Sequence, residues 1–257
     1  MHTEVVKFMF NFKYLSRAFC SSVVALTAAQ AAAQTVLTAP IPNIPGFDLV
    51  IENGRVLDPA SGRDEVLNIG ISGGEIIAVT SDELEGEREI DATGYIVAPG
   101  FIDLHTHSPF PFGQLLQTKD GVTTSLDLEA GAFPVGEYGE FIDGQAFGNY
   151  GSSVGHYAAR IKVIEGKDQP YIVTHKGQML PGAAFSEIAT AEQIEEMRDL
   201  LQEGLDNGGL GIGFLLDYMS PAVSDEELRM LFEVAAKNDT VIWAHIRRGV
   251  NGDIGPL

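Results

Sequence analysis

Apolar runs that alternate with helical patterns after Gly94 constrain the fold more than any other feature of the sequence. The first run, residues 95–105, is continuous and ends in a histidine, as expected for a strand buried on both faces. Buried strands separated by helices predict a parallel α/β sheet, and inward side chains at strand ends fit a (β/α)8 TIM-type barrel. The later strands are predicted at residues 122–128, 146–154, 210–215 and 240–246, and the clearest helices at residues 191–207 and 224–238.

Both of these helices carry N-terminal capping patterns. Thr190 precedes the first helix with Gln193 three residues later, and Ser224 precedes the second with Glu227 at the same spacing. In a capping box the cap side chain accepts a hydrogen bond from the later backbone amide, and the later side chain reaches back. Two independent signals, the apolar period and the caps, therefore predict where these helices begin.

The predicted barrel is incomplete. A whole barrel takes about 250 residues, whereas residues 98–257 supply 160 residues and about five strands. The last segment, residues 249–257, has the composition of a loop that follows a strand. We therefore expect residues 98–257 to form the N-terminal part of a truncated barrel with two unpaired sheet edges.

A different pattern precedes the barrel. Residues 47–97 contain strand-length β-branched runs interrupted by Asn53-Gly54 and Gly73-Gly74, which are dipeptides typical of hairpin turns. These residues predict a small β-sandwich-like domain built of hairpins.

Residues 1–34 differ from the rest of the chain. Basic residues precede a mildly apolar run rich in Ala and Ser, and small residues near Ala31 fit an A-x-A cleavage site. This pattern predicts a secretory signal peptide, and three prolines in residues 35–46 predict an extended linker after it. Because a spanning helix needs roughly 20 strongly apolar residues, we expect no stable membrane insertion after signal cleavage and a periplasmic or extracellular protein. Cleavage would also remove Cys20, the only cysteine, so the mature chain would have no disulfide.

The formal net charge of −20 argues against nucleic acid and anionic membrane surfaces as partners. Binding to phosphate groups needs clustered Lys and Arg, and this chain has 16 basic against 36 acidic residues.

His105-Thr106-His107 closes the first predicted barrel strand. Because side chains alternate along a strand, both imidazoles point the same way, into the mouth of the barrel. Two convergent imidazoles at this place suit a zinc-like divalent ion. The spacing alone leaves open a pair of hydrogen-bonded histidines without a metal.

The surrounding residues resemble a known family. Ala-Pro-Gly-Phe-Ile-Asp-Leu-His-Thr-His, residues 98–107, closely resembles the signature of the amidohydrolase superfamily, and it follows a small β domain in the order that this superfamily uses. Over residues 47–249 the chain further resembles the D-aminoacylase, or N-acyl-D-amino-acid deacylase, branch. The matching segments are Lys119-Asp-Gly-Val-Thr-Thr, Asn149-Tyr-Gly-Ser-Ser-Val-Gly-His156, Gly209-Leu-Gly-Ile-Gly-Phe, Tyr218-Met-Ser-Pro and Trp243-Ala-His245-Ile-Arg247.

This resemblance implies a set of metal ligands. His105, His107 and His245 match zinc-binding histidines of the family. D-aminoacylases have a cysteine, within an Asn-Cys-Gly turn, that ligates or bridges the metal after the second strand, whereas this chain has Glu129 in that stretch. A carboxylate can bridge two ions with its two oxygens. The alternative is that Glu129 or Asp127 only orients a ligating imidazole.

The resemblance also implies substrate contacts at His156, Tyr218 and Arg247. The alternatives are a buried structural histidine at 156 and a salt bridge at Arg247. A carboxylated Lys176 is an alternative bridging group. The family completes its site with a histidine after the sixth strand and a general-base aspartate after the eighth, and both are expected beyond residue 257.

The complete protein is therefore expected to be a hydrolase with one or two Zn²⁺ ions that cleaves a carbon–nitrogen bond in a small N-acyl amino acid or related amide. An N-acyl-D-amino acid is the leading substrate, and the alternatives within the superfamily are a cyclic amidase and a dipeptidase. The truncated chain is expected to be inactive. Two further alternatives are a non-catalytic fragment or pseudoenzyme, and a periplasmic metal- or ligand-binding module.

Overall fold

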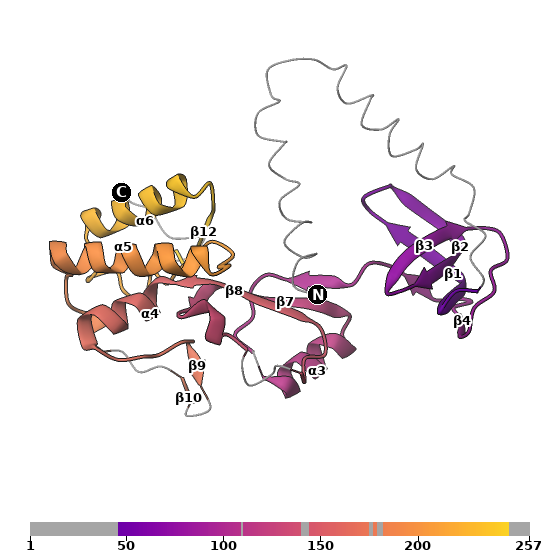
Figure 1. Ribbon diagram of the computed structural model, residues 1–257, viewed down its shortest axis with the longest axis horizontal. Coiled ribbons are helices and arrows are strands. Elements are labelled where there is room, and N and C mark those ends of the chain that lie inside the picture. The colour runs from indigo at the N-terminus through magenta and orange to yellow at the C-terminus, as the bar shows by residue number, and fades with distance from the viewer. Residues whose placement is uncertain (1–45, 109, 140–143, 175–176, 179–181, 247–257) are drawn as a thin grey trace, which may run out of the picture. The chain divides into compact units, whose positions relative to one another are not determined.

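The structure is a computed structural model, and it describes residues 46–108, 110–139, 144–174, 177–178 and 182–246. The chain divides into two compact units after Pro99 (Figure 1). The predicted signal peptide and all of the predicted linker except Gly46 lie outside the described residues. A search of the described residues finds no helix with the length and apolar character that crossing a membrane requires.

The first unit is a five-stranded sheet in which β1 pairs with three other strands (Figure 1). The β1 strand pairs antiparallel with β2 and parallel with β4 and β5, and β2 pairs antiparallel with β3. The strands are β1 (Leu49–Asp58), β2 (Arg63–Ser72), β3 (Glu75–Thr80), β4 (Glu89–Asp91) and β5 (Ile96–Val97).

Only one of the two predicted glycine turns is a hairpin turn. Gly73 and Gly74 both have positive φ and join β2 to β3. Asn53-Gly54 lies inside β1 instead, so the predicted turn at this place is wrong. Asn53 has a φ of 58° at a register shift between β1 and β2, and its N–H donates to the Asn68 side chain at 2.9 Å. The same left-handed conformation that suits a turn also suits a β-bulge.

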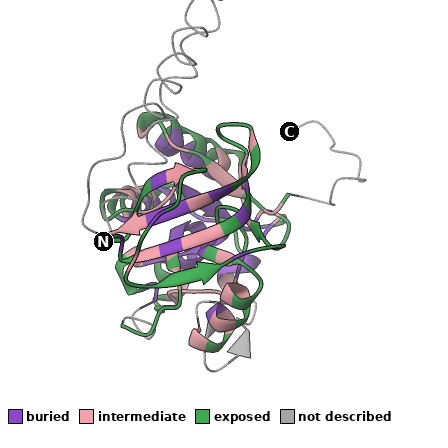
Figure 2. Cartoon of the chain, turned by 90° about the vertical axis from the view of Figure 1, so that its right-hand side faces the viewer, coloured by how far each residue is buried: buried purple, intermediate pink, exposed green. Residues whose placement is uncertain are grey.

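Buried and more exposed residues alternate over residues 53–57 of β1 and residues 66–69 of β2 (Figure 2). This alternation places apolar side chains on the covered face of the sheet. The Phe47 ring takes the space that a Cβ on Gly70 would need, since such a Cβ would lie 2.6 Å from the ring. The buried clusters of this unit are Phe47, Val50, Ala78 and Leu84, and Val56, Leu67 and Ile69.

The second unit is a curled parallel sheet whose spatial order, β6-β7-β8-β11-β12, follows the order of the chain. All neighbouring strands in it are parallel. This is the arrangement of an incomplete TIM-type barrel, so the predicted fold class is confirmed. The strands are β6 (Phe101–Asp103), β7 (Val122–Ala132), β8 (Asn149–Gly155), β11 (Ile212–Phe214) and β12 (Ile242–Ala244).

Helices and short turns connect these strands. The Thr190 hydroxyl and the Gln193 side chain form the predicted capping box of α5, and the Ser224 hydroxyl accepts from the Glu227 amide at the start of α6. The Glu227 side chain does not complete a capping box, because it is buried and contacts His156 instead. The helices are α3 (Pro111–Lys119), α4 (His156–Arg160), α5 (Ala191–Asp206) and α6 (Asp225–Lys237), with shorter η2 (Val135–Glu137), η4 (Ile161–Glu165) and η5 (Ala183–Phe185) and the strand pair β9 (Val173–Thr174) and β10 (Gly177–Gln178).

The apolar run 95–105 is not one doubly buried strand, so this prediction is wrong. Pro99 and Gly100 separate β5, which belongs to the first unit, from β6, which belongs to the second. Among the described residues, β6 pairs on one side only, with β7. Phe101 and Ile102 are consequently 68% and 59% exposed.

Candidate metal centre

The His105-Thr106-His107 segment follows β6 directly and is fixed by backbone contacts. The Asp103 carboxylate accepts a hydrogen bond from the His105 N–H at 3.0 Å. The Leu126 carbonyl on β7 accepts from the Thr106 N–H at 3.1 Å. The end of one strand is thereby held against its neighbour, where TIM-type barrels place their functional side chains.

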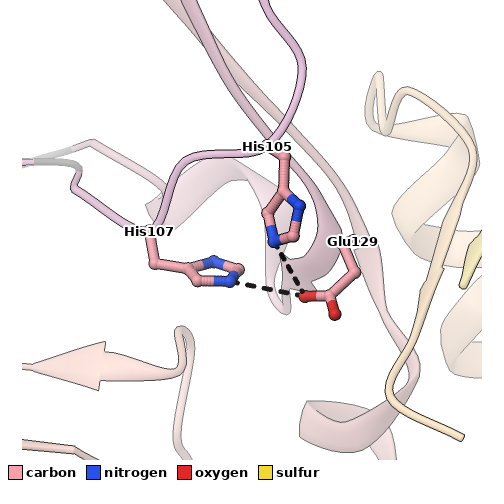
Figure 3. Close-up of side chains that lie close together, drawn as sticks. All are labelled: His105, His107 and Glu129. Carbon is pink, nitrogen blue, oxygen red and sulfur yellow. Dashed lines mark ion pairs between the residues drawn. The ribbon is translucent and has the colours of Figure 1, made fainter. Parts of the chain in front are cut away.

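Three donor atoms, one each from His105, His107 and Glu129, lie within 4.8 Å of one another. Both imidazoles turn toward the Glu129 carboxylate (Figure 3). Glu129 Oε2 lies 3.6 Å from His105 Nε2 and 3.3 Å from His107 Nε2. A distance of 3.6 Å is too long for a hydrogen bond. It fits instead the edge of a coordination tetrahedron, about 3.4 Å for bonds of roughly 2.0–2.1 Å.

Asp127 holds the other side of the His107 ring. Its carboxylate is 1% exposed, lies 3.1 Å from His107 Nδ1, and also accepts from the Gly131 N–H at 3.2 Å. The hydrogen bonds of Asp127 and then Glu129 raise the pKa of His107 to about 10, although partial burial acts against them. The contact fixes the ring so that Nε2 faces Glu129, which is the role of a carboxylate behind a metal-binding histidine.

Gly131 lets β7 and β8 approach closely beside this contact. Its φ is +75°, and a Cβ there would lie 2.6 Å from Ser153 Oγ and 2.7 Å from the Gly155 nitrogen. A larger residue would push the two strands apart directly after Glu129.

His245, at the end of β12, reaches the second oxygen of Glu129. Its Nδ1 lies 2.5 Å from Glu129 Oε1, and its N–H donates to the Phe214 carbonyl at 2.9 Å. Burial acts to raise the pKa of Glu129, but the hydrogen bonds from His107 and His245 outweigh it and leave this pKa below its usual value. Each carboxylate oxygen thus faces imidazole nitrogens from a different part of the sheet.

A cavity of about 360 Å³ opens over this cluster. The Tyr218 ring, 55% exposed, lies 4.7 Å from the His245 ring between centroids. The cavity therefore offers apolar walls next to three convergent polar side chains, as ligand sites commonly do. Its lining residues are Leu104, His105, Glu129, Trp243, Ala244, His245 and Ile246.

The structure does not bring His156 to this cavity. The ring is fully buried, its Nε2 lies 2.7 Å from Glu227 Oε1, and it stacks edge-on against Phe214. The Arg160 guanidinium, also fully buried, pairs with the second oxygen of Glu227. This position agrees with the alternative of a buried structural histidine.

Two predicted site positions lie outside the described residues. These are Arg247 and Lys176. Sequence reasoning missed two residues at the site, Gln117 behind the His-x-His segment and Trp243 in the cavity wall. The Trp243 position could have been found, since it stands two residues before His245, and alternate side chains along an extended segment share a face.

Comparisons with known proteins find relatives over most of this chain. No family model matches the chain. Over 209 residues the chain is 29% identical to a dihydroorotase of Streptococcus pneumoniae. The matched region covers 80% of this chain and 44% of that protein. Over 208 residues it is 26% identical to an adenine deaminase of Bacillus velezensis. This match covers 80% of this chain and 33% of that protein. The chain thus spans less than half the length of these curated relatives.

Solved structures carry the same fold. An N-acyl-D-glutamate deacylase of Bordetella bronchiseptica, solved with zinc and a phosphonate inhibitor, superposes with a TM-score of 0.62 at 26% identity, over 79% of this chain and 45% of that one. A D-aminoacylase gives a TM-score of 0.59 at 23% identity, over 78% of this chain and 45% of that one. These likenesses support the amidohydrolase superfamily for this chain, and its structural neighbours include D-aminoacylases.

Proposed function

We propose that this chain carries the first metal ligands of a zinc-dependent hydrolase that cleaves a carbon–nitrogen bond in a small N-acyl amino acid. The observation that carries the proposal is the convergence of the His105, His107 and Glu129 donor atoms at separations of 3.3 and 3.6 Å. The 3.6 Å separation is too long for a hydrogen bond, and both separations are close to those between ligands of one ion.

The donor set suits zinc. Two imidazoles and a carboxylate oxygen are ligands that Zn²⁺ accepts, and a catalytic site leaves further positions for water or substrate. A bound zinc ion would lower the pKa of a coordinated water to about 7 and polarise an amide carbonyl. Asp127 would keep the His107 ring in the orientation that directs Nε2 to the ion.

Glu129 supports a second ligand function. Its Oε2 faces His105 and His107 while its Oε1 faces His245 at 2.5 Å. A carboxylate with imidazoles on both oxygens suits a bridge between two ions. We therefore propose one or two zinc ions, with Glu129 as their shared ligand. His245 Nδ1 hydrogen-bonds Glu129 Oε1 at 2.5 Å and would have to leave this hydrogen bond to bind the second ion.

An N-acyl-D-amino acid is the proposed substrate. Its support is the structural likeness to the N-acyl-D-glutamate deacylase, and the apolar side chains that share the cavity with the histidines. A cyclic amide is the second candidate, because the curated relatives include a dihydroorotase. The general-base aspartate that the family resemblance implies is not assigned to any residue of this chain.

Zinc analysis and an amine-release assay test this proposal. Zinc content is measured on the 257-residue chain, on the full-length protein, and on both with Glu129→Gln, with Glu233→Gln as a control at an exposed site. Amine release is followed from matched N-acyl-D- and N-acyl-L-amino acids and from a cyclic amide. Zinc in the unaltered proteins, lost in Glu129→Gln, with D-selective release by the full-length form, would support the proposal. Absence of zinc from both unaltered proteins would overturn it and favour a binding module.

The cellular location is also a proposal. The pattern of residues 1–34 supports export and signal cleavage, which would place the mature protein in the periplasm or outside the cell. Fractionation of producing cells, with N-terminal sequencing of the mature protein, tests this. An uncleaved N-terminus in the cytosolic fraction would contradict it.

A further inference from the structure

We propose that Gln117, on α3, is a positioning residue that sets the geometry of the His-x-His segment and thereby its metal affinity. This inference rests on the metal site proposed above. Gln117 lies outside the donor cluster, and its effect would act through the backbone and side chains of the segment that carries His105 and His107.

The Gln117 carboxamide joins three separate pieces of chain. Its Nε2 donates to Asp103 Oδ2 at 3.2 Å and to Thr106 Oγ1 at 2.9 Å. Its Oε1 accepts from the Ser125 hydroxyl at 3.0 Å. One side chain thus contacts the end of β6, the residue between the two histidines, and β7.

Thr106 is the point at which this network controls the histidines. Side chains alternate along an extended segment, so Thr106 points away from the donor cluster when its two neighbours point toward it. The Thr106 side chain is indeed buried, at 7% exposure, and its hydroxyl oxygen accepts from Gln117 and, at 3.3 Å, from the Ser108 N–H. Rotation of this segment would move both imidazoles together.

Asp103 provides a second connection. Its Oδ1 accepts from the His105 N–H at 3.0 Å, and its Oδ2 accepts from Gln117. Because an ionised carboxylate can only accept, the Gln117 nitrogen must face it, which fixes the orientation of the amide. A glutamate at 117 would offer no donor and would set two carboxylates against each other.

The same helix provides a matched control. Gln114 lies one turn before Gln117 on α3 and is more deeply buried, at 3% exposure. Its Oε1 accepts from the Phe147 N–H at 3.3 Å, away from the His-x-His segment. Replacement of Gln114 tests the loss of a buried glutamine from α3 without loss of the Thr106 and Asp103 contacts.

The experiment compares Gln117→Leu with Gln114→Leu in the 257-residue chain. Each protein is stripped with a chelator and titrated with Co²⁺, whose visible absorption reports ligand geometry, and zinc affinity follows by competition. We expect Gln117→Leu to weaken metal binding by about 10- to 100-fold and to alter the cobalt spectrum, as losses of residues behind metal ligands do. Gln114→Leu is expected to lower the melting temperature about as much as Gln117→Leu does. It is expected to leave the metal affinity and the cobalt spectrum unchanged.

A rescue variant separates positioning from general stability. Gln117→Glu is expected to weaken metal binding as Gln117→Leu does. Adding Asp103→Asn restores a donor opposite the new carboxylate, and the new amide oxygen at 103 still accepts from the His105 N–H. We therefore expect the double variant to recover at least part of the affinity lost in Gln117→Glu, measured as a coupling in a double-mutant cycle.

The outcomes separate the two proposals. Suppose that the unaltered chain binds metal, and that Gln117→Leu and Gln114→Leu lose equal metal affinity or none at all. That result would overturn the positioning role and leave the metal site standing. No rescue by the double variant would also count against it. Failure of the unaltered chain to bind cobalt or zinc would overturn the metal site and the inference together.

Discussion

The second unit contains two clusters that join histidine to carboxylate, and they differ in almost every physical respect. In the open cluster, Glu129 faces His105, His107 and His245, whose side chains are 61%, 30% and 38% exposed. In the closed cluster, Glu227 is fully buried with His156 and Arg160, each at 0% exposure.

Charge and hydrogen bonding explain the difference. In the closed cluster an arginine supplies the positive charge, and its Nε and Nη2 donate to the Ala184 and Glu187 carbonyls. In the open cluster no arginine or lysine pairs with Glu129 among the described residues, and imidazole nitrogens alone face its two oxygens. A histidine–carboxylate contact is therefore no indication of a site by itself. The informative feature is convergence of several nitrogens on one carboxylate beside a cavity.

The largest expected effect is at Glu227. Glu227→Gln leaves the Arg160 guanidinium buried without its charge partner, which should lower the free energy of unfolding by about 3–5 kcal/mol. Trp243, the only tryptophan, lies in this unit, so its fluorescence during urea denaturation reports the loss. A loss below about 1 kcal/mol, the range of exposed pairs, would break the comparison. So would a folded Glu227→Gln protein that no longer binds zinc.

The reverse pattern is expected at Glu129. Glu129→Gln removes the negative charge that three imidazoles share, and a neutral amide oxygen is a poor zinc ligand, so zinc affinity should fall by more than about 100-fold. Unfolding in the absence of metal should change less than in Glu227→Gln, because the imidazoles are 30–61% exposed and stay partly hydrated. Isothermal titration with zinc and urea denaturation of the chelated protein measure the two effects. Unchanged zinc affinity would mean that the open cluster is not a metal site.

A smaller effect is expected at Asp127, which contacts His107 but lies outside the donor cluster. Asp127→Asn keeps an acceptor for the imidazole but loses the charge behind it, so zinc affinity should fall by about tenfold. The same titration measures this, and the loss should be smaller than in Glu129→Gln. A larger loss would indicate that Asp127 and not Glu129 is the ligand.

The closed cluster should also respond to pH. Burial acts to raise the pKa of Glu227, but His156 and Arg160 outweigh it and hold this pKa below its usual value. A carboxyl group with a lowered folded pKa contributes stability above its unfolded pKa of about 4.3, and that stability is lost as the pH falls further. The difference in unfolding free energy between the unaltered chain and Glu227→Gln should therefore shrink below about pH 4.3. A difference that grew on acidification would contradict the lowered pKa.

The sequence predicted the open cluster much better than the closed one. His105 and His107 stand two residues apart directly after β6, and order along the chain together with family resemblance pointed to Glu129 and His245. Glu227 instead stands at a capping-box position, where a surface role is the ordinary interpretation. Its contacts with His156 and Arg160 span 71 and 67 residues. They depend on how α4 and α6 pack on the sheet, which no local pattern encodes.

The same distinction holds for the fold. Parallel order and the starts of α5 and α6 followed from apolar period and capping residues. The interruption of run 95–105 at Pro99 did not, because both flanking pieces are apolar and the pairing of β5 with β1 is a tertiary choice. Asn53-Gly54 is similar, since a left-handed residue permits a turn or a bulge and the register of β1 and β2 decides between them.

The smallest effect is expected at an arginine–glutamate pair between α5 and α6. Arg198 on α5 contacts Glu233 on α6 at 3.0 Å, with side chains 32% and 52% exposed, so this pair has the chemistry of Arg160 and Glu227 without the burial. Solvent screens it and its side chains lose entropy on pairing, so Glu233→Gln should lower the free energy of unfolding by only about 0.2–1 kcal/mol. Added salt should reduce even this loss, because screening lengths shorten as ionic strength rises. Urea denaturation at low and high salt, followed through Trp243, compares the two glutamates on one helix. If Glu233→Gln cost as much as Glu227→Gln, burial would not be what separates the closed cluster from an ordinary ion pair.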